Sequence, residues 1–245
     1  MYATFATRAA LLSILVTATA AAQSATNGDS ATTLAAELLR RSSASISVVQ
    51  SRPQGAFGER VGLGYGAAGT YLFRLDDAGV WSLRAEAGIM SYGGESRRTK
   101  LSESVGDRVQ VRVETSNYIV PILFGVQLAR PDGAVRPYAN AGAGWQAFFT
   151  ESTLRGTSDI IDFASTTNHS AWAPAWAVGG GLAMPVYSGK TSVQLDLGAQ
   201  YVAGGRARYL TNGSIVDLPG GAIRVTPVES ATHLVVVRVG ARITR

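Results

Sequence analysis

The sequence predicts an all-β protein, an eight-stranded antiparallel up-and-down transmembrane β-barrel with short turns at one end and long loops at the other. Three observations predict this fold: segments in which apolar residues alternate with small or polar ones, connections of two lengths, and an N-terminal export signal. Side chains in a strand point to opposite faces in turn, so each such segment has one apolar face and one small or polar face. In a membrane barrel the apolar face meets lipid and the other face lines the lumen.

The N-terminus is expected to be a secretory signal peptide over residues 1–22. Arg8 supplies the positive start, residues 9–20 are mostly apolar, and three alanines at 20–22 suit a cleavage site. The alternative is an uncleaved anchor, but this run is far shorter than the ~20 apolar residues that span a bilayer. Residues 23–43 are expected to be a flexible or short-helical periplasmic lead-in, with a helix over 34–41, and residues 44–245 form the barrel.

The composition limits the kinds of ligand and cross-link that this chain can have. The chain has a net charge of +5, with its basic residues spread along the sequence, which gives no indication of nucleic-acid binding. It contains no cysteine, which excludes disulfides and thiolate metal sites. Its two histidines and scattered carboxylates show no metal-ligand spacing, so neither a metal nor another cofactor is expected.

Alternation is clearest over residues 80–92, where Trp81, Leu83 and Ile89 share one face. In the fourth segment the apolar set changes parity near Thr115–Asn117, which predicts a one-residue β-bulge at that point. The eight predicted strands are 44–51, 60–74, 80–92, 108–129, 135–150, 171–186, 190–203 and 232–244.

The connections predict the topology. Tight turns rich in Gly, Asp and Pro occupy 76–79, 131–134 and 188–189, and they alternate with longer connections. Short turns on the periplasmic side and long loops outside are typical of transmembrane barrels. Trp and Tyr near both ends of the strands agree with two membrane interfaces. The expected outer loops are 52–59, 93–107, 151–170 and 204–231.

Five charged residues fall on the inward faces of the predicted strands: Arg84, Glu86, Arg136, Asp196 and Arg238. Eight strands leave an interior only just wide enough for side chains, and buried charges need partners. We therefore expect these residues to pair in a polar network across the lumen. The alternative is a path for ions.

Taken together, residues 44–245 resemble the small outer-membrane barrels of the OmpA/OmpX type. The resemblance rests on the export signal, the amphipathic strands and the two lengths of connection, and it implies the fold, an outer-membrane location and a monomer. It also implies insertion by the barrel assembly machinery, with outer-membrane lipid and lipopolysaccharide around the barrel. Such barrels usually end in an aromatic residue that this machinery reads, whereas this chain ends with residues 241–245, ARITR.

Candidate catalytic groups are few. His169 and Ser170 are adjacent, so in a strand they face opposite sides and are poorly placed as base and nucleophile. His233 and Glu229 could form a site with Asp159 or Asp162, but we favour the interpretation that these are solvated polar residues of the loops. Residues 64–69 match a dinucleotide-binding G-x-G-x-x-G pattern, yet the segment continues as a strand instead of opening a helix.

Loop 93–107 carries Arg97, Arg98 and Lys100, which are candidates for contact with lipopolysaccharide phosphates. The leading functional hypothesis is a non-enzymatic outer-membrane barrel with a structural or surface-interaction role through its loops. One alternative is an outer-membrane enzyme acting on lipid A or peptides. Another is a soluble exported binder of a hydrophobic ligand, similar to a lipocalin, whose bulky apolar faces would point inward.

Overall fold

The computed structural model describes residues 36–100, 110–156, 162–211, 213–217 and 223–244. The chain divides into two compact units, Met1–Ser42 and Ser43–Arg245. The expected signal peptide lies outside the described residues. In the first unit residues 36–40 are helical, within the segment expected to be helical, and Glu37 accepts hydrogen bonds from the side chains of Arg40 and Arg41.

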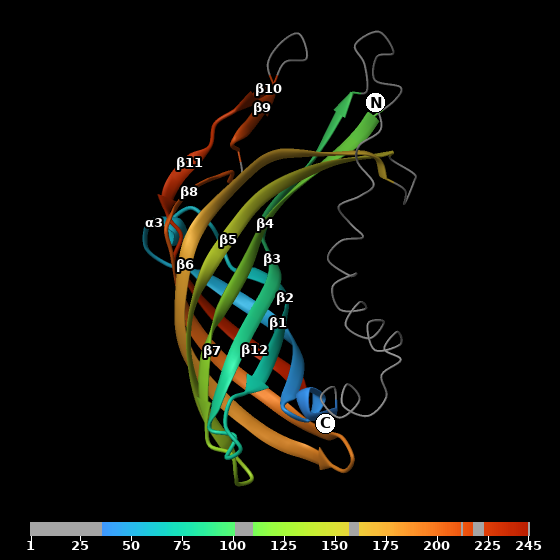
Figure 1. Cartoon of the computed structure of the whole chain (residues 1–245). Coiled ribbons are helices and arrows are strands. Elements are labelled where there is room, and N and C mark those ends of the chain that lie inside the picture. The colour runs from blue at the N-terminus through green and yellow to red at the C-terminus, as the bar shows by residue number, and fades with distance from the viewer. Residues whose placement is uncertain (1–35, 101–109, 157–161, 212, 218–222, 245) are drawn as a thin grey trace, which may run out of the picture. The chain divides into compact units, whose positions relative to one another are not determined.

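The second unit is the barrel. In the described part of the chain, eight strands close in the order β1-β12-β7-β6-β5-β4-β3-β2 (Figure 1), and every neighbouring pair with a described register is antiparallel. The predicted fold class is therefore confirmed, as is the architecture implied by the resemblance to small OmpA/OmpX-type barrels. The barrel strands are β1 (Ser42–Pro53), β2 (Gly64–Arg74), β3 (Trp81–Lys100), β4 (Gln110–Ala129), β5 (Arg136–Gly156), β6 (Asp162–Ser188), β7 (Ser192–Gly204) and β12 (Leu234–Thr244).

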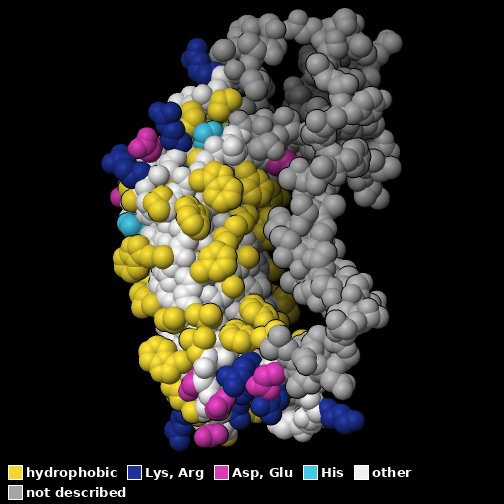
Figure 2. All heavy atoms as spheres, in the orientation of Figure 1, with side chains coloured by type: hydrophobic (Ala, Val, Ile, Leu, Met, Phe, Trp, Pro, Cys, Tyr) yellow, Lys and Arg dark blue, Asp and Glu magenta, His cyan; other side chains and the backbone are white. Residues whose placement is uncertain are grey.

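The apolar faces predicted from alternation point outward. On β3 the side chains of Trp81, Leu83 and Ile89 are about half exposed, whereas Arg84 and Glu86 between them are buried. Figure 2 shows apolar side chains over the middle of the barrel wall and charged ones toward both ends. Such an outer surface suits lipid, and it is opposite to the arrangement that a lipocalin-like binder needs. No helix among the described residues is long and apolar enough to cross a membrane.

The one-residue bulge predicted within β4 is wrong, because the shifts of register lie on β3 and β6. From Val111 to Ala129 the register of β4 against β5 runs without interruption. On β3, however, Tyr92 is an extra residue between the pairs Ser91–Tyr118 and Gly93–Asn117. A second shift, on β6, falls opposite Thr150, which is itself the partner of Asn117. The shift beside β4 is thus carried by β3, and the shift on β6, two strands away from β4, falls at the same height of the barrel.

Two of the expected outer loops are mostly strand. The β3–β4 hairpin stays paired as far as Lys100 and Gln110, and the β5–β6 hairpin as far as Arg155 and Asp162. Arg97, Arg98 and Lys100 therefore lie on β3 and not in a loop. These strand extensions could not be predicted from the sequence, because alternation of apolar and polar residues is expected only where one face of a strand meets lipid and the other meets the lumen. Beyond that region both faces can be polar.

The other two long connections also contain regular structure. Between β1 and β2 lies a single helical turn, α3 (Gly55–Gly58). Between β7 and β12 are four short strands in two two-stranded sheets, β8 with β11 and β9 with β10. We call the end of the barrel that carries these elements the loop end, and the opposite end the turn end. The short strands are β8 (Arg206–Tyr209), β9 (Ile215–Asp217), β10 (Ile223–Val225) and β11 (Val228–Ala231).

At the turn end, the connection from β2 to β3 is closed by Asp76. Its carboxylate accepts hydrogen bonds from the backbone N–H groups of Trp81 at 2.7 Å and Val80 at 3.1 Å. The backbone N–H of Gly79, which has a φ of 72°, bonds to the carbonyl of Asp76. Glycine suits this turn because its backbone adopts a positive φ without steric cost.

Candidate functional site in the barrel lumen

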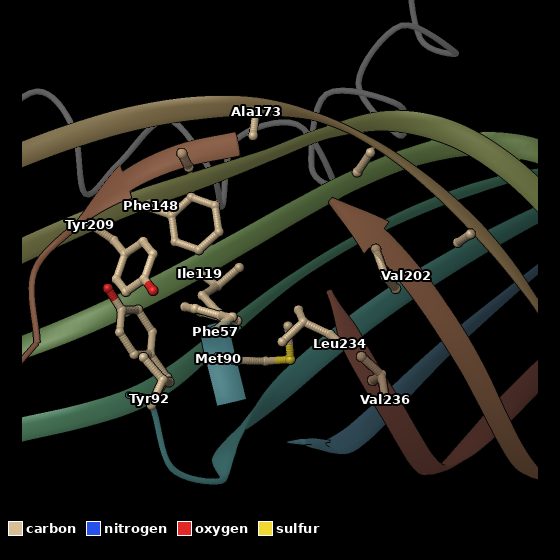
Figure 3. Packing of buried hydrophobic residues seen from close by; sticks show 14 of the residues in the cluster. Phe57, Met90, Tyr92, Ile119, Phe148, Ala173, Val202, Tyr209, Leu234 and Val236 are labelled. Atoms are coloured by element: carbon tan, nitrogen blue, oxygen red, sulfur yellow. The ribbon is translucent and has the colours of Figure 1, made fainter. Parts of the chain in front are cut away.

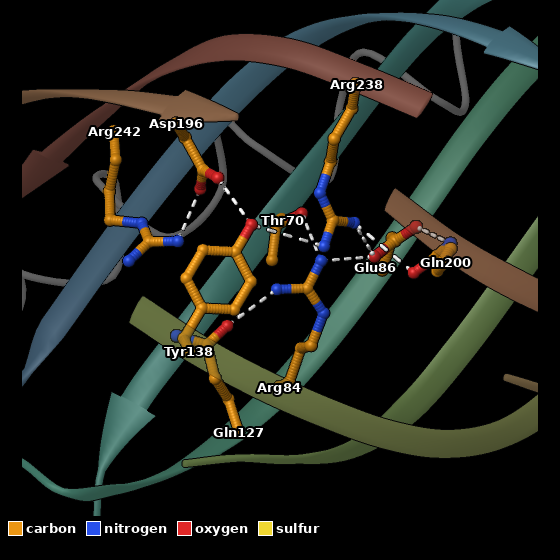
Figure 4. A network of polar contacts seen from close by, with 9 residues as sticks. All are labelled: Thr70, Arg84, Glu86, Gln127, Tyr138, Asp196, Gln200, Arg238 and Arg242. Atoms are coloured by element: carbon orange, nitrogen blue, oxygen red, sulfur yellow. Dashed lines mark hydrogen bonds and ion pairs between the residues drawn. The ribbon is translucent and has the colours of Figure 1, made fainter. Parts of the chain in front are cut away.

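The lumen of the turn-end half holds a network of buried polar side chains contributed by β2, β3, β4, β5, β7 and β12 (Figure 4). Alternation explains why they meet, because each lies on the inward parity of its strand. The charged members are each less than a tenth exposed. The network comprises Thr70, Arg84, Glu86, Gln127, Tyr138, Asp196, Gln200, Arg238 and Arg242.

Glu86 on β3 is one centre of this network. Its carboxylate pairs with the guanidinium of Arg84 on the same strand and accepts from Arg238 Nη1 on β12 at 3.0 Å. Gln200 on β7 donates to the other carboxylate oxygen at 2.7 Å. Arg84 also donates to Gln127 Oε1 at 2.9 Å. The Glu86 carboxylate thus joins β3, β7 and β12, and Arg84 extends the network to β4 through charge-assisted hydrogen bonds, which are stronger than neutral ones.

Asp196 on β7 is the second centre. It accepts a 2.6 Å hydrogen bond from the hydroxyl of Tyr138 and pairs with the guanidinium of Arg242. The Arg242 guanidinium also lies over the Tyr138 ring, 5.3 Å from its centre, where the ring quadrupole favours a cation. Tyr138 in turn lies 3.5 Å from Arg238 Nη2, and this weak contact links the two centres.

Gly198 makes room for that link. A Cβ atom at this position would lie 2.6 Å from both Arg238 Nε and the Tyr138 hydroxyl, closer than any real contact allows. Gly198 therefore leaves the space in which Arg238 and Tyr138 approach each other beside β7. The glycines of the inward faces are part of how the polar network fits into a barrel this narrow.

Of the five residues expected to line the lumen, the structure brings together Arg84, Glu86, Asp196 and Arg238. Arg136 is not part of the network. It is the first residue of β5, at the turn end, and its Nε donates to the Gly133 carbonyl of the preceding turn at 3.3 Å. Sequence reasoning did not select the remaining members, although the same inward parity marks them: Thr70, Gln127, Tyr138, Gln200 and Arg242.

The charges of the network do not balance. Three guanidiniums face two carboxylates, which leaves one excess positive charge inside the lumen. Beside Glu86 and Arg84 is a void of about 10 Å³, which has room for about one water molecule. Asn140 lines this void, and its buried amide nitrogen has no hydrogen-bond partner in the structure. This arrangement suits a bound water that accepts from Asn140 and solvates the ion pair.

The loop-end half of the lumen holds a buried hydrophobic cluster (Figure 3), together with buried polar pairs such as Asn117 with Thr150. Phe57, on α3, is fully buried and packs edge-on against the rings of Tyr92, Phe148 and Tyr209, at centroid distances of 6.0, 6.0 and 4.8 Å. The hydroxyl of Tyr92 donates to the Leu210 carbonyl at 3.2 Å. We call Phe57, Tyr92, Phe148 and Tyr209 the aromatic cluster. Sequence reasoning missed it because Phe57 and Tyr209 lie in connections, where no alternation indicates which side chains turn inward.

The candidate catalytic residues do not form a catalytic set. His169 and Ser170 are consecutive in β6, and His169 Nε2 lies 2.9 Å from the carbonyl oxygen of Arg208. Glu229 is paired with the guanidiniums of Arg206 and Arg208 instead of a histidine.

Among the described residues, the other candidate residues do not complete a catalytic set either. The ring of His233 stacks on that of Tyr201 at a centroid distance of 6.0 Å. Asp159 lies outside the described residues, and Asp162 is the first residue of β6. The glycine motif at 64–69 lies wholly within β2, as the sequence predicted.

No protein-family model and no curated protein sequence matches the chain. Among solved structures it is similar to Neisserial surface protein A, with 10% sequence identity over 83% of this chain and 97% of that one and a TM-score of 0.41. It is also similar to Ail, the attachment invasion locus protein of Yersinia pestis, with 17% identity over 82% and 97% of the two chains and a TM-score of 0.38. A major outer membrane protein from Thermus thermophilus gives 13% identity, 81% and 98% coverage and a TM-score of 0.39.

Proposed function

We propose that this chain is a non-enzymatic outer-membrane β-barrel, with a closed lumen, that acts at the cell surface through its loop end. The main observation behind the proposal is that the outer and inner faces of the barrel wall carry different kinds of side chain. Bulky apolar residues face outward, while the charges face inward and are paired with one another. Lipid outside and a narrow filled interior account for both faces.

The height of the apolar belt supports the membrane assignment. On β6 the exposed apolar side chains include Trp172 and continue from Trp176 through Val178 and Leu182 to Val186. With Trp172 in the membrane interface, where tryptophan is common, the lipid-facing stretch runs from Trp176 to Val186. Ten residues of strand rise about 33 Å, and at a tilt near 40° they span about 25 Å along the barrel axis. This is the height of the lipid-facing band in outer-membrane barrels.

Two structures inside the barrel support a closed lumen. The polar network crosses the turn-end half, and the aromatic cluster lies in the loop-end half. Opening a path for ions would require breaking buried ion pairs and exposing four rings to water, which is costly in both halves. The role we propose is therefore structural or adhesive.

The partners we propose follow from this location. They are the lipids of the outer membrane, lipopolysaccharide, and the machinery that inserts barrels. The paired hairpins β3–β4 and β5–β6 extend the wall at the loop end, and they carry Arg97, Arg98 and Lys100. We propose that the barrel works as a monomer and that these strands contact other components of the cell surface.

The first experiment compares boiled with unboiled samples of the outer-membrane fraction by gel electrophoresis in detergent. A folded membrane barrel migrates differently until it is heated, so a mobility shift in this fraction is expected. A protein that is soluble in the periplasm and shows no shift would contradict the proposal.

Planar bilayers then test the lumen. The reconstituted barrel is expected to give no steady ion current, and a steady current would show that the lumen is open. Incubation with lipid A or peptides tests the enzymatic alternative. Product release that disappears in His169→Ala or His233→Ala variants would establish an enzyme.

A further inference from the structure

The loop end carries a pair of arginines on the outer face of β8. The sequence Arg206-Ala207-Arg208 lies in a strand, so both guanidiniums point to one side while Ala207 and Tyr209 point into the core. The two arginine side chains are 76% and 72% exposed. Residues two apart in a strand have Cα atoms about 7 Å apart, so two guanidiniums can reach one small anion.

Glu229 on β11 holds these two arginines. It lies opposite Arg208 in the register of β8 and β11. Its Oε1 is 3.1 Å from Arg206 Nε, and its Oε2 is 3.5 Å from Arg208 Nε. Each arginine therefore uses its Nε on the carboxylate. Within the described residues, the terminal Nη groups of both have no hydrogen-bond acceptor, and the trio keeps one excess positive charge.

The position of the trio matches the headgroups of a bilayer. Next to Arg206, the backbone N–H of Gly205 donates to the Pro174 carbonyl of β6 at 2.7 Å, and the Arg208 carbonyl lies 2.9 Å from His169 Nε2, so β8 follows β6 from Pro174 toward His169. Trp176 marks the upper edge of the apolar belt, and Trp172, 64% exposed, lies four residues beyond it. Four residues of tilted strand rise about 10 Å, the depth at which tryptophan and lipid phosphates occur.

We propose that Arg206 and Arg208, aligned by Glu229, form a clamp for the phosphate group of a phosphorylated outer-leaflet lipid such as lipid A. Free Nη groups in a planar fork match the oxygens of a phosphate, and this geometry makes arginine the preferred partner for it. Trp176 lies below the clamp and Trp172 lies at its height, so the two rings are placed to contact the same lipid near its acyl region. This inference rests on the proposed function, since it needs the loop end to lie at the outer leaflet.

The test measures binding of diphosphorylated lipid A to the purified full-length barrel in a zwitterionic detergent, by native mass spectrometry. The double variant Arg206→Gln/Arg208→Gln is expected to bind at least about tenfold more weakly, because it loses charge-assisted hydrogen bonds to phosphate. The control is Arg130→Gln/Arg136→Gln, which removes the same charge from the turn end and is expected to bind within about twofold of wild type. Lipid A without phosphates is expected to bind wild type as weakly as the double variant binds the phosphorylated form.

Glu229→Gln separates a clamp from general attraction between charges. The substitution raises the positive charge of the trio but removes the carboxylate that aligns both arginines. Weaker binding of lipid A supports the clamp, and stronger or unchanged binding overturns it. Equal binding by wild type and the double variant, or by lipid A with and without phosphate, also overturns it.

Two further measurements distinguish a lipid phosphate from free phosphate and check that each variant still folds as a barrel. Inorganic phosphate at millimolar concentration is expected to compete only weakly, and complete displacement would show a site for free anions instead of a lipid. Each variant is checked for the mobility shift on boiling. A wild-type barrel that folds but does not bind lipid A refutes the clamp alone, whereas a wild-type chain that forms no membrane barrel would refute the proposed function.

Discussion

Glu86 and Arg238, 152 residues apart in the sequence, meet inside the barrel with Arg238 Nη1 3.0 Å from Glu86 Oε2. Glu86 lies on β3 and Arg238 on β12, and β2 and β1 separate these two strands along the wall. Both are almost fully buried. Because Glu86 also pairs with Arg84, a single carboxylate serves two guanidiniums and connects distant parts of a wall that is otherwise held by neighbouring strands.

Replacing Glu86 is therefore expected to be costly. Glu86→Gln keeps the shape but leaves Arg84 and Arg238 buried with no carboxylate, and breaking a buried pair from one side typically costs about 3–5 kcal/mol. Urea unfolding in lipid vesicles, followed by tryptophan fluorescence, measures this loss. The control combines Glu86→Gln with Arg84→Gln and Arg238→Met, which removes all three charges and is expected to recover much of the stability. A single variant as stable as wild type would contradict the structural role of the pair.

The part of this network that sequence reasoning found depended on alternation. Arg84, Glu86, Asp196 and Arg238 stand on strands with clear apolar partners on the opposite face, so their inward direction could be inferred. Arg136 has the same parity, but it begins its strand. There the turn offers the Gly133 carbonyl and the side chain never enters the lumen. Parity gives the face of a residue, whereas its height in the barrel depends on register, which sequence alone does not provide.

The loop end was the least predictable part. The strands of β3 to β6 were expected to end near the membrane, but pairing continues well beyond it because hydrogen bonds between strands need no apolar face. Phe57 and Tyr209 lie in connections without any periodicity, so their burial could not be inferred. Similarly, the bulge needed by β4 was recognised from its change of parity, but whether β4 or a neighbour accommodates it depends on pairing between strands.

A second prediction concerns Gly198. Gly198→Ala places a Cβ 2.6 Å from Arg238 Nε and the Tyr138 hydroxyl, so both side chains must move and the contact between them is lost. Such overpacking typically costs about 1–3 kcal/mol. Gly62→Ala is the matched control, because a Cβ at Gly62 has nothing within 4 Å. Urea midpoints of the two variants are compared, and equal midpoints would show that the lumen adapts without strain.

The aromatic cluster leads to a third prediction. Phe57→Ala removes a fully buried ring that contacts three others, and losing a buried phenylalanine costs about 3–5 kcal/mol. This loss of stability is expected to affect mainly the loop end, since α3 and β8 pack against the barrel through this cluster. Hydrogen exchange should become faster at Ala207 and Tyr209 while the barrel strands stay protected. Phe57→Leu keeps apolar bulk and should change exchange much less. Unchanged protection of β8 in Phe57→Ala would refute this role for the ring.

The turn from β2 to β3 is expected to be sensitive to pH through Asp76. The backbone N–H of Trp81, and after it that of Val80, hydrogen-bonds to the carboxylate and holds the pKa of Asp76 below its ordinary value. A group with a lowered folded-state pKa stabilises the fold above its unfolded-state pKa, about 3.9 for aspartate. That contribution is lost as the pH falls through the lower, folded-state value. Wild type should therefore exceed Asp76→Asn in stability at pH 6, and the difference should shrink steadily below about pH 4. Urea unfolding of both proteins across this range provides the measurement. A difference that stays constant as the pH falls would mean that the charge of Asp76 does not close this turn.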